Sequence, residues 1–265
     1  MHVAGGTYPG DLLDTIARLA QEGHPVPCVT VVNHIGLPAE IKRVSPKTFV
    51  VFRRVFGKDD PSPENMGWPS GAQWLDYMGG MPVEADAIQY ANEWYTDNGR
   101  PASDFTRFRD FYLSLMDACT ARGLHCTVLD LRPGHIELDQ FEVLRPVFAQ
   151  AERQSHVINY HMYGTDKKDW DMTAGAEWFA LRWVKWLKDY PRLRIIGGEA
   201  GEYNSPRYRD PATTVAMMGQ LQELLKPYAS QVIGACWWTL AGTPGDWSGD
   251  DWKDALPAYE AWQRA

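Results

Sequence analysis

The sequence has no long hydrophobic run and no block of positive charge. No apolar stretch approaches the roughly 20 residues of a membrane-spanning helix, and Asp and Glu outnumber Lys and Arg by 34 to 26. We therefore expect neither a membrane nor a nucleic acid as a partner. No signal peptide precedes the first apolar residues. This leaves two expectations for location: a cytoplasmic protein, or a protein released after its leader was removed.

Cysteine is also scarce, and the common cofactor and nucleophile motifs are absent. The four Cys residues have no metal-like spacing and are interpreted as buried free thiols, with a Cys119–Cys126 disulfide as the alternative. The chain has neither the G-x-G-x-x-G turn of dinucleotide-binding proteins nor the G-x-S-x-G turn of serine hydrolases. His135, Glu137 and Asp139 offer metal ligands, but nothing nearby in the sequence completes the set. We predict no cofactor and no metal.

What the chain does have is a regular alternation of short apolar runs with amphipathic stretches. This alternation is typical of strand–helix units around a parallel sheet. The apolar runs are residues 1–4, 26–35, 48–55, 85–91, 125–131, 157–162, 194–198 and 232–238. Eight units in 265 residues, close to the roughly 250 of a (β/α)8 barrel, predict an α/β fold: a single (β/α)8 TIM barrel with residues 1–265 as one domain. The rival, an open doubly wound sheet, would normally carry the glycine-rich turn.

The predicted helices lie between these runs. Asp11 and Asp210 precede amphipathic stretches and are expected to cap helices, the second with Pro211 in its first turn. A Trp-rich stretch predicts another helix over residues 173–190. The remaining helices are predicted at residues 38–44, at 72–78, between Ser103 and Gly123, around Phe141 to Phe148, and from about residue 254.

Polar residues gather where the predicted strands end. In a (β/α)8 barrel these ends form one face, and this face carries the active site. The residues at the ends are Asn33, His34, Arg53, Arg54, Asn92, Glu93, Asp130, His161, Tyr163, Glu199, Trp237 and Trp238. Because the fourth and seventh strands face each other across the barrel, we expect Glu93 and Glu199 to meet over its axis.

Two carboxyl groups in this position suit the hydrolysis of a glycosidic bond. A neutral carboxylic acid protonates the leaving oxygen, and an ionised carboxylate about 5–5.5 Å away attacks the anomeric carbon in enzymes that retain configuration. The acid needs a raised pKa, which we expect burial and the neighbouring carboxylate to provide. The twelve Trp residues fit this chemistry, since flat aromatic faces stack on sugar rings.

The segments Ala91-Asn92-Glu93 and Gly198-Glu199-Ala200-Gly201 resemble the paired motifs of clan A glycoside hydrolases, which are (β/α)8 barrels that act with retention. The resemblance implies that Glu93 is the acid/base, that Glu199 is the nucleophile and that Asn92 binds the sugar 2-hydroxyl. It covers most of the chain as architecture, but only about four short segments as motifs.

Two further segments resemble the clan. His161-Met162-Tyr163 is similar to its sixth-strand segment, whose Tyr hydrogen-bonds the nucleophile. Either Trp237 or Trp238 matches the eighth-strand Trp beneath the cleaved sugar, and the other is expected to pack against helices, because neighbouring strand residues point to opposite faces. From their positions at or just past the strand ends, Asn33, His34, Arg53, Trp94 and Glu202 are further candidates to line the substrate site. For Trp94 the alternative is loop packing, and for Glu202 it is capping of the next segment.

Two positions keep alternatives. The clan often places an Arg at the end of the second strand, where this chain has Asn33-His34, so Arg53 or Arg54 on the third strand is the expected substitute. Glu202 competes with Glu199 as nucleophile, but Glu199 follows the predicted strand directly.

The sequence therefore predicts a retaining glycoside hydrolase, monomeric and free of cofactors, that cleaves β-glycosidic bonds of a polysaccharide or oligosaccharide. Three alternatives stay open. One is a carbohydrate-binding barrel without catalysis, and another is a metal-dependent hydrolase. The third is a lysin-type enzyme that degrades cell-wall glycans.

Overall fold

The computed structural model describes residues 1–3, 10–56, 62–90, 92–93, 105–164, 171–202, 210–238, 240 and 252–265. The strands within them are β1 (His2–Val3), β2 (Cys28–Val32), β3 (Phe49–Arg53), β4 (Ala87–Gln89), β5 (Thr127–Leu131), β6 (Val157–Tyr160), β7 (Met162–Gly164), β8 (Arg194–Glu202) and β9 (Val232–Trp237). β6 and β7 form one barrel strand, because both pair with β8 and only His161 separates them. Each of the eight predicted apolar runs thus contains a barrel strand.

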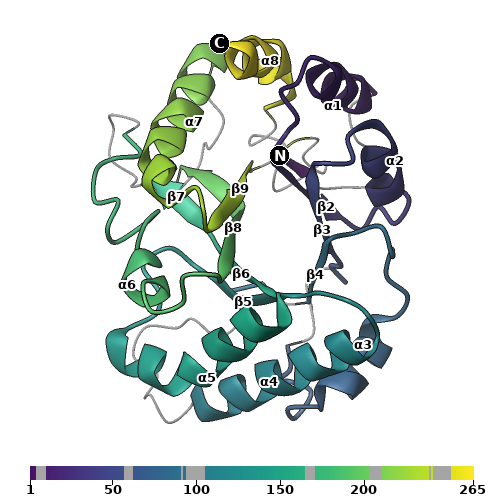
Figure 1. The fold of residues 1–265 in the computed structure, drawn as a ribbon, viewed down its shortest axis with the longest axis vertical. Helices are drawn as coiled ribbons and strands as arrows, with labels where there is room; N and C mark the ends of the chain where they lie inside the picture. Colours follow the sequence, from purple (N-terminus) through teal and green to yellow (C-terminus); the bar gives the residue numbers. More distant parts are fainter. Residues whose placement is uncertain are drawn as a thin grey trace.

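All strand pairs are parallel, and the sheet closes on itself. Pairing runs from β1 through β2 and β3 to β4 on one side, and from β5 through β6 and β8 to β9 on the other. Parallel bridges between Ile88 and Cys126 and between Val3 and Leu240 join the two halves. Figure 1 shows the resulting ring of strands inside a ring of helices. The predicted (β/α)8 barrel is confirmed. The rival prediction of an open sheet is wrong, because such a sheet would keep two free edges.

The helices that surround the ring are α1 (Leu12–Gln21), α2 (Leu37–Val44), α3 (Gly71–Met78), α4 (Phe105–Ala121), α5 (Leu138–Gln154), α6 (Val184–Leu187), α7 (Pro211–Leu225) and α8 (Leu256–Arg264). They are amphipathic: α1 buries Leu12, Ile16 and Leu19 on one face. Strands covered on both faces have no side exposed to solvent, which explains why all five residues of β2 are buried.

Two local predictions are wrong. Residues 173–183 wind through turns, and only the short α6 is helical within the predicted helix at 173–190. Gly175 has a φ of 65°, which interrupts the α-helical ladder, and amides such as that of Trp178 bond three residues back. Asp11 precedes α1, but its side chain makes no capping hydrogen bond. Asp210 does cap α7, since its Oδ1 accepts from the N–H of Thr213 at 3.0 Å.

The four cysteines are buried and free, so the alternative Cys119–Cys126 disulfide is not formed. The thiols of Cys28 and Cys236 are in contact, with their sulfurs 3.3 Å apart. Among the described helices, none combines the length and the apolar composition needed to cross a bilayer.

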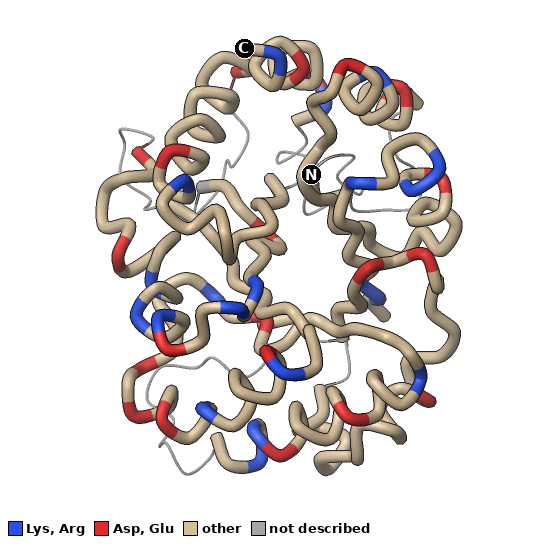
Figure 2. The backbone as a smooth tube through the Cα atoms, in the orientation of Figure 1, with Lys and Arg blue, Asp and Glu red and all other residues tan. Residues whose placement is uncertain are grey.

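The strands carry a concentrated set of buried polar side chains. Those from the strands and the β6–β7 break are His2, Thr30, Arg53, Gln89, Thr127, Asp130, Asn159, His161 and Glu199. Burying such groups costs free energy unless they hydrogen-bond or pair with opposite charge. Most other charged residues lie on the surrounding helices and loops, with both signs interspersed (Figure 2). The polar interior therefore marks a place where chemistry, rather than stability, determines the residue types.

Candidate active site

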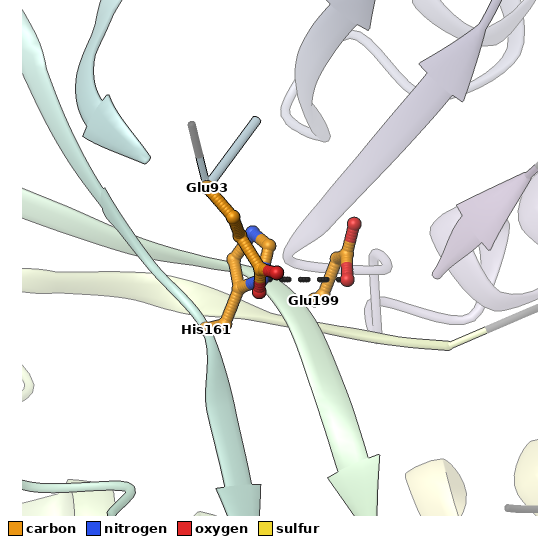
Figure 3. A group of neighbouring side chains, drawn as sticks. All are labelled: Glu93, His161 and Glu199. Carbon is orange, nitrogen blue, oxygen red and sulfur yellow. Dashed lines mark hydrogen bonds and ion pairs between the residues drawn. The ribbon is translucent and has the colours of Figure 1, made fainter. Parts of the chain in front are cut away.

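Glu93 and Glu199 meet at the C-terminal end of the barrel strands. Glu93 follows β4, Glu199 lies in β8, and a carboxylate oxygen of each lies within 4.8 Å of the other. The imidazole of His161, from the break between β6 and β7, joins them (Figure 3). Its Nδ1 is 2.5 Å from Oε1 of Glu93 and 3.4 Å from Oε2 of Glu199. The expected meeting of two acids over the axis is therefore observed, and a histidine contacts both.

Glu199 is held by a donor on each oxygen. Nη1 of Arg53, the last residue of β3, donates to Oε1 at 2.7 Å, and the hydroxyl of Tyr163 in β7 donates to Oε2 at 2.8 Å. Nε2 of His2 lies 4.0 Å from Oε1. Only 9% of the Glu199 side chain is exposed. These contacts fix the carboxylate in one orientation and favour its ionised form.

Glu93 is less enclosed, with 29% of its side chain exposed. Its backbone is left-handed, with a φ of 52°, and its N–H donates to the carbonyl of Asp130 at 3.2 Å. Besides the contact with His161, Oε2 lies 3.6 Å from Nε of Arg132. Glu93 is thus the member of the pair that solvent can reach.

The pKa values of these three groups depend on one another. Burial acts to raise the pKa of both glutamates, but nearby positive charge outweighs it and holds both below the ordinary carboxyl value. For Glu93 this charge comes mainly from His161, and for Glu199 from His161 and Arg53. Burial acts to lower the pKa of His161, but the two carboxylates outweigh it and raise this pKa. The resting site therefore holds two carboxylates and an imidazolium.

The expectation of a raised pKa for Glu93 is wrong. Burial and the neighbouring carboxylate both act to raise the pKa of Glu93, but the imidazolium of His161, 2.5 Å away in direct hydrogen-bond contact, lowers it. Because the two groups are in direct contact, the pKa of each depends on the charge of the other, and they titrate as a coupled pair.

Within the described residues, Glu93, His161 and Glu199 are also the group whose spacing could suit a metal ion. Two ligands of a tetrahedral ion at about 2.1 Å lie about 3.4 Å apart. The 2.5 Å between His161 and Glu93 is instead a hydrogen-bond distance, and the guanidinium of Arg53 already neutralises Glu199. The arrangement thus fits proton transfer better than metal binding.

The second candidate metal site consists of His135, Glu137 and Asp139, and in the structure the carboxylate of Glu137 forms an ion pair with an arginine. Oε2 of Glu137 pairs with Nη2 of Arg182 at 2.9 Å. Burial lowers the pKa of His135, with the positive charge of Arg132 acting in the same direction. The ion pair with Arg182 accounts for the position of the Glu137 carboxylate.

Trp237 and Trp238 point to opposite sides of the barrel wall. The ring of Trp238 packs on His2 with centroids 4.2 Å apart, close to Glu199. Trp237 lines a hollow with Leu221 of α7 and Tyr259 of α8, outside the barrel. Trp237 is therefore the member of the pair that packs against helices, so it does not line the substrate site, because alternate side chains of a strand face opposite sides. Trp238 is left as the candidate for the sugar platform.

Of the residues at the ends of β2 and β3, some contact the two carboxylates and others hold neighbouring loops. Asn33 donates to the carbonyl of Val55 at 2.8 Å and accepts from its N–H at 2.9 Å, so its amide links two loops rather than turning toward the carboxylates. Arg54 donates to the carbonyl of Met78. Of the two neighbouring arginines, Arg53 at the end of β3 and Arg54 just after it, the structure thus places Arg53 beside Glu199.

Four other predicted residues are placed only in part. Asn92 stands beside Glu93, with its Oδ1 3.5 Å from Nε2 of Gln89. His34 is half-buried just beyond β2. Glu202 ends β8, where its backbone pairs with that of Gly164, but its side chain lies outside the description. Trp94 also lies outside the described residues.

Sequence reasoning missed His2 and Arg132. His2 belongs to the two-residue β1, and burial lowers its pKa to about 3, so that it is neutral beside Glu199. Arg132 directly follows β5, just as a polar residue follows most other strands. The same strand-end rule that selected Glu93 would therefore have found Arg132. For His2 the short apolar run offered no comparable signal.

No family model and no curated protein sequence matches the chain. Solved structures do match it. An endo-β-1,4-glucanase from Xanthomonas axonopodis pv. citri is 11% identical with a TM-score of 0.55, over 99% of this chain and 98% of its own. An endo-β-1,4-mannanase from Thermotoga petrophila is 10% identical with a TM-score of 0.52, over 97% and 74%.

A third similar structure is an endo-β-1,3-glucanase from Amycolatopsis mediterranei in complex with laminaritriose. It is 15% identical with a TM-score of 0.51, over 98% of this chain and 97% of its own. Likeness at such identities concerns the backbone rather than the site. The chain is a (β/α)8 barrel with the architecture of these glycoside hydrolases.

Proposed function

We propose that this protein is a retaining glycoside hydrolase that cleaves β-glycosidic bonds of a polysaccharide or oligosaccharide. The observation that carries the proposal is the approach of the Glu93 and Glu199 carboxylates to within 4.8 Å. Retaining pairs lie about 5–5.5 Å apart, whereas inverting pairs need about 6.5–9.5 Å to admit a water. The motif resemblance to clan A and the β-glycan-cleaving neighbours in fold support the same activity.

In this proposal Glu199 is the nucleophile. The hydrogen bonds from Arg53 and Tyr163 keep it ionised and aim it at the anomeric carbon. Attack forms a bond between a carboxylate oxygen and that carbon while the glycosidic bond breaks. The same donors stabilise the carboxylate when it departs in the second step. Trp238 is the proposed platform for the sugar at this carbon, and Asn92 the proposed partner of its 2-hydroxyl.

Glu93 then acts as acid and later as base, with His161 as its proton store. A bound sugar displaces water, and loss of solvation disfavours the charged form of the pair. The proton passes from Nδ1 of His161 to Glu93 and on to the departing oxygen. In the second step Glu93 takes a proton from the water that attacks the glycosyl-enzyme. His161 recovers this proton, which closes the cycle without a cofactor.

The test compares Glu93→Ala and Glu199→Ala with the wild type on aryl β-glycosides and on β-glucan and mannan. Glu93→Ala is expected to lower kcat on unactivated substrates by about 10²–10⁴-fold, and Glu199→Ala at least as strongly. Azide should restore turnover of an activated aryl glycoside by Glu199→Ala and yield a glycosyl azide of inverted configuration. Full activity in either variant would refute the assignment.

Three controls separate the rivals. Azide rescue in Glu202→Ala instead would move the nucleophile to Glu202. Loss of wild-type activity after treatment with a chelator would favour a metal-dependent hydrolase. Binding of glycans by the wild type without turnover on any of them would favour a carbohydrate-binding barrel without catalysis.

A further inference from the structure

A continuous line of hydrogen bonds crosses the barrel interior between the two glutamates. The N–H of Glu93 donates to the carbonyl of Asp130 at 3.2 Å. Nδ2 of Asn159 donates to Oδ1 of Asp130 at 2.6 Å, and Oδ1 of Asn159 accepts from the N–H of Gly198 at 2.9 Å. Gly198 directly precedes Glu199. The backbone segments that carry the two carboxylates are thus connected through two side chains.

These two side chains are costly to bury. Asp130 and Asn159 are both 0% exposed. Asp130 also accepts from the hydroxyls of Thr127 at 3.1 Å and Tyr112 at 3.4 Å, yet burial raises its pKa to about 7. Apolar residues of similar volume would often serve stability as well or better at such positions. Their presence therefore indicates a task that hydrocarbon cannot perform.

The backbone around this line is strained in a way that needs support. Glu93, Leu129 and Asp130 have φ values of 52°, 78° and 41°, and residues without a glycine's freedom rarely adopt them. The pairing of β5 with β6 shifts register at the same place, between Val128 and Leu131. Strain of this kind persists only where surrounding contacts enforce it. The hydrogen bond from Glu93 to Asp130 is such a contact.

Asn159 has to be an amide, because one of its two hydrogen bonds needs a donor and the other an acceptor. Asn159 donates on one side and accepts on the other, which an amide can do and a carboxylate or an alkyl group cannot. Gly198 permits the approach, because a Cβ there would collide with Oδ1 of Asn159. We infer that Asn159 and Asp130 are positioning residues that set the distance between the Glu93 and Glu199 carboxylates without touching substrate. Only the kinetic tests of this inference depend on the proposed function.

The first test is Asn159→Ala, assayed on whichever glycoside the wild type cleaves. A displacement of about 1 Å at a catalytic group can cost on the order of 10²-fold in rate. We expect kcat to fall by about that factor while KM changes little, since substrate contacts are kept. The matched control is Gln150→Leu, which removes another buried amide, hydrogen-bonded to Asp117 between α4 and α5. Its kcat should equal that of the wild type, even if its melting temperature falls.

The second test reverses the donor and the acceptor. Asn159→Asp replaces the donor amide with a carboxyl group beside Asp130. Burial already raises the pKa of Asp130 to about 7, and a second carboxylate raises it further, so the pair keeps one proton up to neutral pH and loses it only above. We therefore expect kcat of Asn159→Asp to fall above neutral pH, and the double variant Asp130→Asn/Asn159→Asp to restore it there, because the new amide donates to the new carboxylate at any pH. The other titratable groups that face Asp130 are Tyr112, Cys126, His161 and Arg53, and all stay the same in both variants. A double variant no better than Asn159→Asp above neutral pH overturns the inference.

A third test needs no substrate. Crystal structures of the wild type and Asn159→Ala should show the Glu93 and Glu199 carboxylates farther apart in the variant, by about 1 Å. An unchanged separation overturns the positioning role, whatever the activity. Failure of the wild type to hydrolyse any glycoside refutes the proposed function instead. The two failures are thereby distinguished.

Discussion

His161 contacts both glutamates, and its charge determines how each of them titrates. The raised pKa of the imidazole and the lowered pKa values of Glu93 and Glu199 have the same origin, which is attraction across short distances. In the proposed mechanism Glu199 must be ionised to attack, so we expect its lowered pKa to place the acid limb of kcat/KM below the ordinary carboxyl value of 4.5. In the same proposal the pair of Glu93 and His161 must hold a proton, so we expect the raised pKa of His161 to place the basic limb above 6.5.

His161→Gln tests this dependence at the residue scale. The amide still donates to Glu93 but cannot store a proton, so Glu93 alone has to carry it. A carboxyl group loses its proton at lower pH than an imidazolium that is paired with two carboxylates. We expect the basic limb of kcat/KM to move to lower pH and the acid limb to move to higher pH, because His161 also supplies positive charge that lowers the pKa of Glu199. Measurement of kcat/KM from pH 3 to 9 for both proteins checks this, and an unmoved basic limb contradicts it.

At the scale of elements, irregular strands coincide with the site. The β6–β7 strand breaks at His161, whose N–H donates to the carbonyl of Leu131 in β5. The pairing of β8 with β9 shifts register between Gly197 and Ala200, on either side of Glu199. Such irregularities change the direction in which a side chain points. They bring His161 and Glu199 to one point, which straight strands with regular alternation would not do.

The helix caps allow an element-scale prediction with an internal control. Asp210 accepts a hydrogen bond from the N–H of Thr213 in α7, whereas Asp11 makes no capping bond at α1. Asp210→Ala should therefore lower the melting temperature by about 2–4 °C, and Asp11→Ala should leave it nearly unchanged. Thermal unfolding followed by circular dichroism checks both variants. Equal effects would show that position before a helix matters more than the bond.

The charge of the whole molecule bears on its substrate. The net charge is −8, yet basic and acidic residues are mixed over the described surface, without a band of one sign (Figure 2). A neutral glycan is not steered by such a field, whereas an anionic one is repelled. We expect kcat/KM on a neutral β-glucan to stay nearly constant between about 0.02 and 0.5 M salt. A steep salt dependence, measured at fixed pH, would point to a charged substrate.

The sequence alone determined the barrel and the two acids. The apolar runs locate all eight barrel strands because strands covered on both faces must be apolar, and this requirement is visible locally. Glu93, Glu199, Arg53, His161 and Tyr163 could be selected because the C-terminal ends of all parallel strands share one face. The site was thus predictable to the extent that it follows from strand order.

Only the tertiary structure decided how these residues act on one another. His161 and Glu93 are 68 positions apart, and no local pattern reveals that their side chains are in contact. No local pattern shows that Trp238, rather than Trp237, lies on the side of Glu199. No local pattern shows either that Asn159 links Asp130 to Gly198. Electrostatic and hydrogen-bond energies depend on distances of a few ångströms. These distances exist only once the ring has closed.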